Sequence, residues 1–133
     1  MKKLTLLIAL TITLVAKADM EEFGCGWRFK ANIAAYYDGK EYSEPRLTNS
    51  TFYWNGDCDK LMKFVQDNGE VESYYIKSNE RVIEGKNNDG IPYKAFFIYD
   101  KKTHRSLVFQ VVYDDNGTYV KLIDKTGEYI LFK

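Results

Sequence analysis

The sequence predicts a mainly β fold: an antiparallel meander that forms a curved sheet or small barrel, with one short helix at residues 58–67. Apolar and polar residues alternate with period two over most of the chain, as in half-buried strands. Aromatic residues, which favour strands, make up 16% of the sequence. The connections between apolar runs are short, so they suit hairpins and not parallel crossovers. An α+β fold is the alternative.

The first 18 residues have the features of a cleaved signal peptide. Lys2 and Lys3 precede an apolar run at 4–15, and residues 16–18 give the small-x-small pattern that signal peptidases cut. This run of about twelve residues is shorter than the roughly twenty that a membrane-spanning helix needs. We therefore expect residues 19–133 to form a single β-rich domain that is periplasmic or secreted, with no membrane span.

The charge balance argues against nucleic acid as a partner. The full chain has 19 basic and 19 acidic residues, and loss of the leader would leave 16 and 19, a net charge of −3. Nucleic-acid binding is driven by clustered Lys and Arg. The charges here are interspersed, as is typical of a solvated exterior.

The first strand of the mature chain is expected at residues 27–37. Residues 27, 29, 31, 33, 35 and 37 are apolar or aromatic and fall on one face, while Arg28, Lys30 and Asn32 fall on the other, which predicts a half-buried strand with one buried face. Asp38-Gly39 follows as a turn signal. Residues 47–54 are rich in residues that suit a pleated surface, so we expect the second strand there.

Residues 58–67 are expected to form the one helix after the leader. Cys58, Leu61, Met62 and Val65 have the i, i+3, i+4, i+7 spacing of one helical face. Asp57 precedes them as an N-cap, and the Asn-Gly pair after residue 67 suits a left-handed end.

From residue 71 onward we expect a run of antiparallel strands. The connections 100–105, 114–117 and 124–127 each begin with Asp, as short hairpin loops prefer. The last four strands are apolar on both faces, which indicates either closure into a barrel or a second face that meets a partner. The strands are expected at 71–77, 81–86, 93–99, 106–113, 118–123 and 129–132.

The two cysteines, Cys25 and Cys58, are expected to form a disulfide. In an oxidising compartment an even pair is most simply one bridge, and 32 residues lie between these two. A zinc site is the alternative, but two cysteines and the single histidine, His104, cannot complete a tetrahedral shell without carboxylates. We therefore expect neither a metal nor a cofactor.

Reactive constellations are not evident in the sequence. His104 falls in an expected turn with no local serine or cysteine nucleophile to activate. A pair of carboxylates could hydrolyse a sugar, and this hydrolase hypothesis rests on the four acidic residues that are least typical of turns. They are Glu70, Glu72, Glu80 and Glu84.

We therefore expect a small exported, non-catalytic binding module whose partner is another protein or envelope component, for example as an inhibitor or neutraliser of an envelope or secreted protein. In adjacent tyrosines, alternation sends one ring of each pair toward water or a partner. These candidates for the binding surface are Tyr36, Tyr37, Tyr74 and Tyr75.

Two alternatives remain open. One is a carrier that holds a small apolar ligand in a barrel cavity lined by Phe97, Phe109 and Tyr119. The other is the small carboxylate-based hydrolase described above.

We predict that the exported protein has no reactive thiol until it is reduced. Replacing Cys25 and Cys58 together by Ser should lower the free energy of unfolding by roughly 3 to 4 kcal/mol, because the unfolded chain is no longer cross-linked. Thiol titration of the denatured protein, with and without reductant, gives the measurement. Two reactive thiols before reduction would contradict the prediction.

Overall fold

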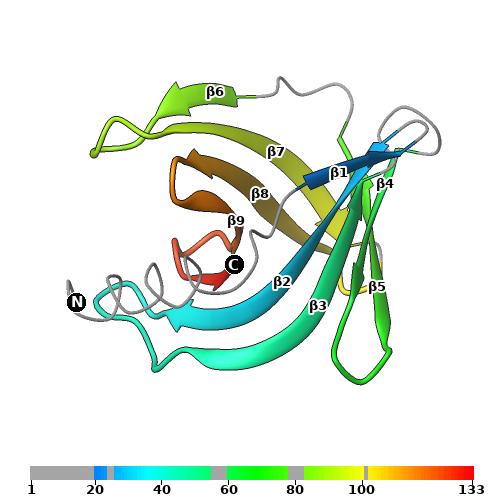
Figure 1. The fold of residues 1–133 in the computed structure, drawn as a ribbon. Helices are drawn as coiled ribbons and strands as arrows, with labels where there is room; N and C mark the ends of the chain where they lie inside the picture. Colours follow the sequence, from blue (N-terminus) through cyan, green and yellow to red (C-terminus); the bar gives the residue numbers. More distant parts are fainter. Residues whose placement is uncertain (1–19, 24–25, 55–59, 78–82, 101) are drawn as a thin grey trace.

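The computed structural model describes residues 20–23, 26–54, 60–77, 83–100 and 102–133. Within these ranges the chain forms ten strands and no helix, so the mainly β prediction is confirmed (Figure 1). The strands are β1 (Met20–Phe23), β2 (Gly26–Tyr37), β3 (Arg46–Trp54), β4 (Leu61–Val65), β5 (Val71–Ile76), β6 (Ile83–Lys86), β7 (Pro92–Asp100), β8 (Arg105–Asp114), β9 (Gly117–Ile123) and β10 (Tyr129–Phe132).

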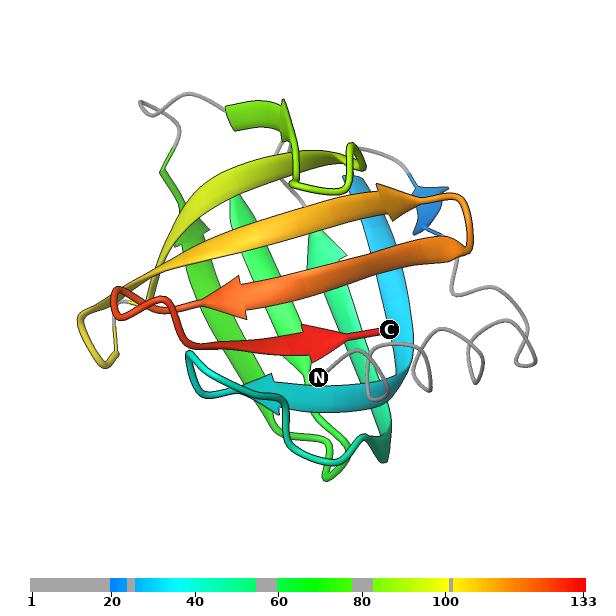
Figure 2. The same ribbon diagram turned by 90° about the vertical axis from the view of Figure 1, so that its left-hand side faces the viewer.

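Eight of these strands close into an up-and-down barrel (Figure 2). Their order around the barrel is β2, β3, β4, β5, β7, β8, β9 and β10, and β10 returns to pair with β2. Apart from the closing pair of β10 and β2, neighbours in the barrel are consecutive in the chain except where β6 intervenes, and all pairs are antiparallel. The small strand β1 adds to β2, and β6 adds to β7. Of the two predicted forms of the meander, a curved sheet or a small barrel, the structure shows the barrel.

A β-bulge reverses the faces of β2 partway along the strand. Its register with β3 shifts between Ala31 and Ile33. Ala31 and Ala34 both pack in the interior core, whereas Ile33 and Ala35 belong to a separate cluster on the outer wall. The prediction of a single buried face for this strand is wrong beyond Ala31, because one extra residue exchanges the two faces.

Residues 61–65 form strand β4, so the predicted helix at 58–67 is wrong in the part that the structure describes. β4 pairs with β3 on one edge and with β5 on the other. Met62 and Phe64 are buried, and the residues on either side of them are partly exposed. A helix would turn Met62 and Phe64 about 200° apart around its axis, whereas a strand buries both.

The barrel interior is packed with aromatic rings. Phe109 is fully buried, with its ring centroid 5.4 Å from that of Phe52 and 5.9 Å from that of Trp54. Trp27 stacks on Trp54 at 5.6 Å. Phe52 stacks in turn on Phe64 at 4.6 Å. These large side chains fill the space that an eight-stranded barrel encloses.

Some sequence predictions concern residues outside the described ranges. They are the leader at 1–18, both cysteines, the first residues of the predicted helix and Glu80. Among the described residues, no helix is long and apolar enough to cross a membrane.

We predict that Phe109→Ala lowers the free energy of unfolding by about 3 to 5 kcal/mol, because it leaves a cavity where the interior rings meet. Chemical denaturation provides the measurement. Leu47→Ala is the matched control, since Leu47 is 83% exposed and its truncation should change stability by no more than about 0.5 kcal/mol. Equal losses in the two variants would contradict an interior position for Phe109.

Candidate functional site at the acidic end of the barrel

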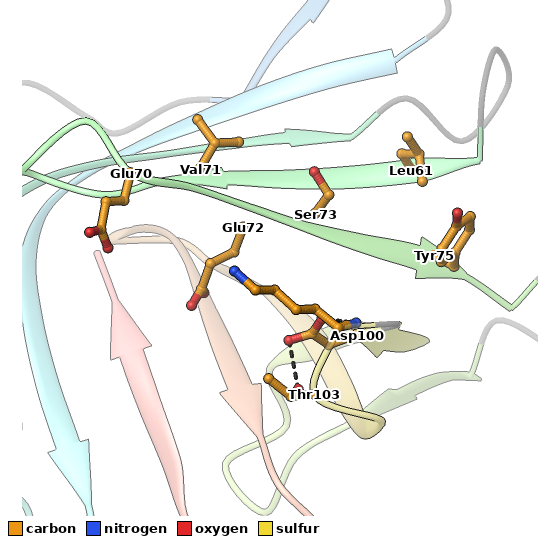
Figure 3. Close-up of a pocket in the computed structure, with 9 residues that line it drawn as sticks. Leu61, Glu70, Val71, Glu72, Ser73, Tyr75, Asp100 and Thr103 are labelled. Atoms are coloured by element: carbon orange, nitrogen blue, oxygen red, sulfur yellow. Dashed lines mark hydrogen bonds between the residues drawn. The ribbon is translucent and has the colours of Figure 1, made fainter.

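A cleft of about 850 Å³ opens where β5 and β7 separate (Figure 3). The two strands pair only at Tyr75 with Tyr99 and at Ile76 with Ile98. β7 then ends at Asp100, whereas the first residues of β5, from Val71 to Ser73, extend beyond that end of β7. The cleft is lined by Leu61, Glu70, Val71, Glu72, Ser73, Tyr75, Asp100, Lys102 and Thr103.

A second cavity of about 290 Å³ lies at the adjacent mouth of the barrel. Its apolar lining includes Phe64, Leu107 and Leu122, which are buried core residues. Its polar and charged lining comes from five strands, β2, β5, β7, β8 and β10, and from the neighbouring turns. These residues are Tyr36, Gln66, Glu72, Tyr74, Asp100, Thr103, Arg105, Asp124, Glu128 and Tyr129.

The two hollows are contiguous, because Glu72, Asp100 and Thr103 line both of them. Together they hold five carboxylates and two basic side chains, a net charge of −3. We call this region the acidic end. Its charged members are Glu70, Glu72, Asp100, Lys102, Arg105, Asp124 and Glu128.

Two tyrosine hydroxyls hold carboxylates of the acidic end in place. Tyr36 Oη donates to Glu128 Oε1 at 2.6 Å, and this bond is the main reason that the pKa of Tyr36 is raised to about 12. Tyr74 Oη donates to Glu72 Oε2 at 2.9 Å. Burial, and then this bond, raise the pKa of Tyr74. Both phenols are therefore protonated hydrogen-bond donors at neutral pH.

Asp100 is held as an anion by the turn that follows it. Thr103 Oγ1 donates to its Oδ2 at 2.7 Å, and the Lys102 amide donates to its Oδ1 at 2.9 Å. The bond from Thr103 is the largest cause of the lowered pKa of Asp100. A catalytic acid needs a shift in the opposite direction, so this carboxylate is better suited to binding a positive charge than to donating a proton.

Three of the four tyrosines predicted for a binding surface lie at the acidic end. Tyr36 and Tyr74 line the mouth cavity, and Tyr75 lines the cleft. Tyr37 instead packs on the outer wall, 4.9 Å from the ring of Tyr129 and 5.0 Å from that of Tyr42.

The structure does not bring together the three residues predicted to line an internal ligand cavity. Phe109 lies inside the barrel. Phe97 lies between Phe96 and Ile98, which belong to or pack against the interior core, so alternation turns it outward. Tyr119 lies on the outer wall, where Lys133 Nζ is 5.2 Å from its ring centroid.

The remaining candidates for chemistry are dispersed. Glu70 and Glu72 line the cleft, while Glu84 is in β6, 3.7 Å from Lys94 Nζ. His104 is exposed in the β7–β8 turn, where its Nδ1 shares a 2.8 Å hydrogen bond with Tyr99 Oη. In the part of the chain that the structure describes, no group of three or more potential ligands could hold a metal ion.

Sequence reasoning missed Asp100 and Asp124, because they were interpreted only as turn residues, and it did not single out Glu128. A usable signal was present. In a meander every second turn falls at the same end of the sheet, so the turns after β7 and β9 had to meet. The acidic residues in those two turns could therefore have been grouped in advance.

We predict that the stability contributed by Asp100 is lost in acid. Because its folded pKa is lowered from the ordinary value of 3.8, this contribution is full above pH 3.8 and disappears as the pH falls through the lowered value. The difference in melting temperature between wild type and Asp100→Asn should therefore be largest at neutral pH and shrink below pH 3.8. Asp115→Asn, an exposed position in the β8–β9 turn, is the control, and parallel curves for wild type and Asp100→Asn would contradict the assignment.

The comparisons with known proteins add no further assignment to this region. No family model matches the sequence, and no curated protein or solved structure matches it either. The candidate site therefore rests on the geometry and charges of the described residues alone.

Proposed function

We propose that this protein is an exported, non-catalytic module that binds another protein through the acidic end of its barrel. The observation that carries this proposal is the contiguity of the cleft and the mouth cavity around Glu72 and Asp100. Inhibition or neutralisation of an envelope or secreted protein is one form that such binding takes. The leader pattern at residues 1–18 is the reason for placing the module outside the cytoplasm.

The composition of the acidic end supports a protein partner. Tyr75 is 46% exposed and Val71 is 56% exposed beside the cleft, and aromatic anchors are enriched in protein interfaces. The surrounding carboxylates favour a partner with a basic patch, because complementary charge steers association and disfavours other partners. A basic protein surface is therefore the chemistry that this end fits best.

A carrier of small apolar ligands receives less support. The interior is packed with rings around Phe109, and the two described hollows are bordered by carboxylates. An apolar ligand seated there would remove water from charged groups without replacing their hydrogen bonds, which is unfavourable.

A carboxylate-based hydrolase also receives less support. The pKa of Asp100 is lowered by its turn, which is the wrong direction for the acid that protonates a leaving group. Glu84 is in β6, near Lys94 and apart from the residues that line the cleft.

The proposal predicts protein capture at one end of the barrel only. A photo-crosslinking amino acid placed at Ser73 should link to a specific protein in an envelope extract, because Ser73 lines the cleft. The same group at Lys86, exposed at the end of β6, is the matched control and should not link to that protein. Equal capture from both positions, or a bound small molecule in the native mass spectrum of the purified protein, would contradict the proposal.

A further inference from the structure

One edge of β5 is open beside the cleft. On its other edge β5 pairs with β4 from Val71 to Tyr75. Toward β7 it pairs only at Tyr75 and Ile76, because β7 ends at Asp100 and the chain turns into β8. The segment from Val71 to Ser73 therefore extends past its neighbour.

Hydrogen-bond alternation identifies the backbone groups that face this opening. Ile76 donates its amide toward β4, to Lys60 O at 2.9 Å, and Lys77 donates toward β7, to Phe97 O at 3.0 Å. Residues of even number in β5 therefore bond to β4, and residues of odd number point the other way. Val71 and Ser73 consequently direct their amides and carbonyls into the cleft, and they have no backbone partner there among the described residues.

The side chains along this edge alternate in chemistry as well as direction. Figure 3 shows Val71 and Ser73 pointing to one side of β5, with Glu70 and Glu72 on the other side, where Glu72 is the nearer to Asp100. An extended segment laid beside β5 would send its own alternate side chains to the same two sides. One set would meet Val71, Ser73 and Tyr75, and the other would meet carboxylates.

We propose that the open edge of β5 receives an extended segment of a partner protein as an added antiparallel strand. Main-chain bonds to Val71 and Ser73 supply affinity, in the manner of strand addition to a sheet edge. Basic side chains at alternate positions meet Glu70, Glu72 and Asp100, and apolar side chains between them meet Val71 and Tyr75. This inference rests on the proposed function and specifies its mode and partner chemistry.

A second copy of the chain is the weaker occupant of this edge. Antiparallel pairing of β5 with itself would place Val71 opposite Ser73 of the copy, and Glu72 would then face its own equivalent. Like charges directly opposite each other destabilise a sheet pair. Acidic side chains on an exposed edge also discourage unwanted pairing between copies, so a basic segment satisfies this edge better.

The test uses the purified protein and a synthetic peptide that alternates lysine with valine. We expect isothermal titration calorimetry to detect binding of this peptide and not of a peptide that alternates glutamate with valine. Methylation of the valine amides, which face β5 in the antiparallel arrangement, should weaken binding about tenfold for two lost hydrogen bonds. Methylation of the lysine amides is the matched control, and equal effects of the two methylated peptides would overturn the proposal.

Two variants test the edge from the protein side. Ser73→Pro removes an amide that faces the cleft and takes part in no bond to β4, so it should weaken peptide binding by about threefold for one lost hydrogen bond while the barrel stays folded. If that variant does not fold, the double variant Glu70→Lys with Glu72→Lys provides the test. It should bind the glutamate–valine peptide more tightly than the lysine–valine peptide, which reverses the preference of the wild type. An unchanged preference would overturn the proposal.

Two further outcomes separate this inference from the proposed function. Protein capture at Ser73 without binding of any alternating peptide would leave the proposed function standing and overturn strand addition. If the wild type dimerises in sedimentation experiments and Ser73→Pro does not, the open edge of β5 binds a second copy of the chain. That result would also overturn strand addition by a partner protein.

Discussion

Antiparallel pairing of β2 with β3 on one edge and with β10 on the other closes this fold, and the remaining features depend on that closure. The bulge after Ala31 allows one strand to bend between its two neighbours. It is fastened by a single carbonyl, because Asn32 and Ile33 both donate their amides to Lys133 O, at 2.8 and 2.9 Å. Closure pairs the edges that an open sheet would expose, and it gathers the large side chains of both halves into one interior.

The barrel is least complete between β5 and β7. β7 pairs with β8 on one edge and with two shorter partners on the other. On that second edge, β6 pairs with residues 92–95 and β5 pairs with residues 98 and 99. Neither partner covers the whole strand, so the ends of β5 and β7 diverge. The cleft is thus a consequence of strand lengths and register, and the neighbouring turns add the carboxylates that give it its charge.

Much of the architecture could be predicted from the sequence, since eight of the ten strands coincide with runs of alternating residues that were expected to form strands. β4 was missed because Leu61, Met62 and Val65 satisfy a helical stripe as well as a strand, and only pairing on both edges decides between them. The bulge in β2 lies where the alternation gives way to an uninterrupted apolar and aromatic run at residues 33–37, and such a run does not show which face is buried. The acidic end was only partly predictable, because its tyrosines stood out as adjacent pairs while Asp100 and Asp124 resembled ordinary turn residues.

The two tryptophans of the chain lie together, far from the acidic end. Trp27 is the second residue of β2 and Trp54 is the last residue of β3, with their ring planes only 8° apart. Parallel indoles this close couple their electronic transitions, so intrinsic emission and near-ultraviolet dichroism both report on one place, the junction of these two strands. Optical signals from the two indoles therefore report directly on opening of the barrel at that junction, in a molecule that carries no added label.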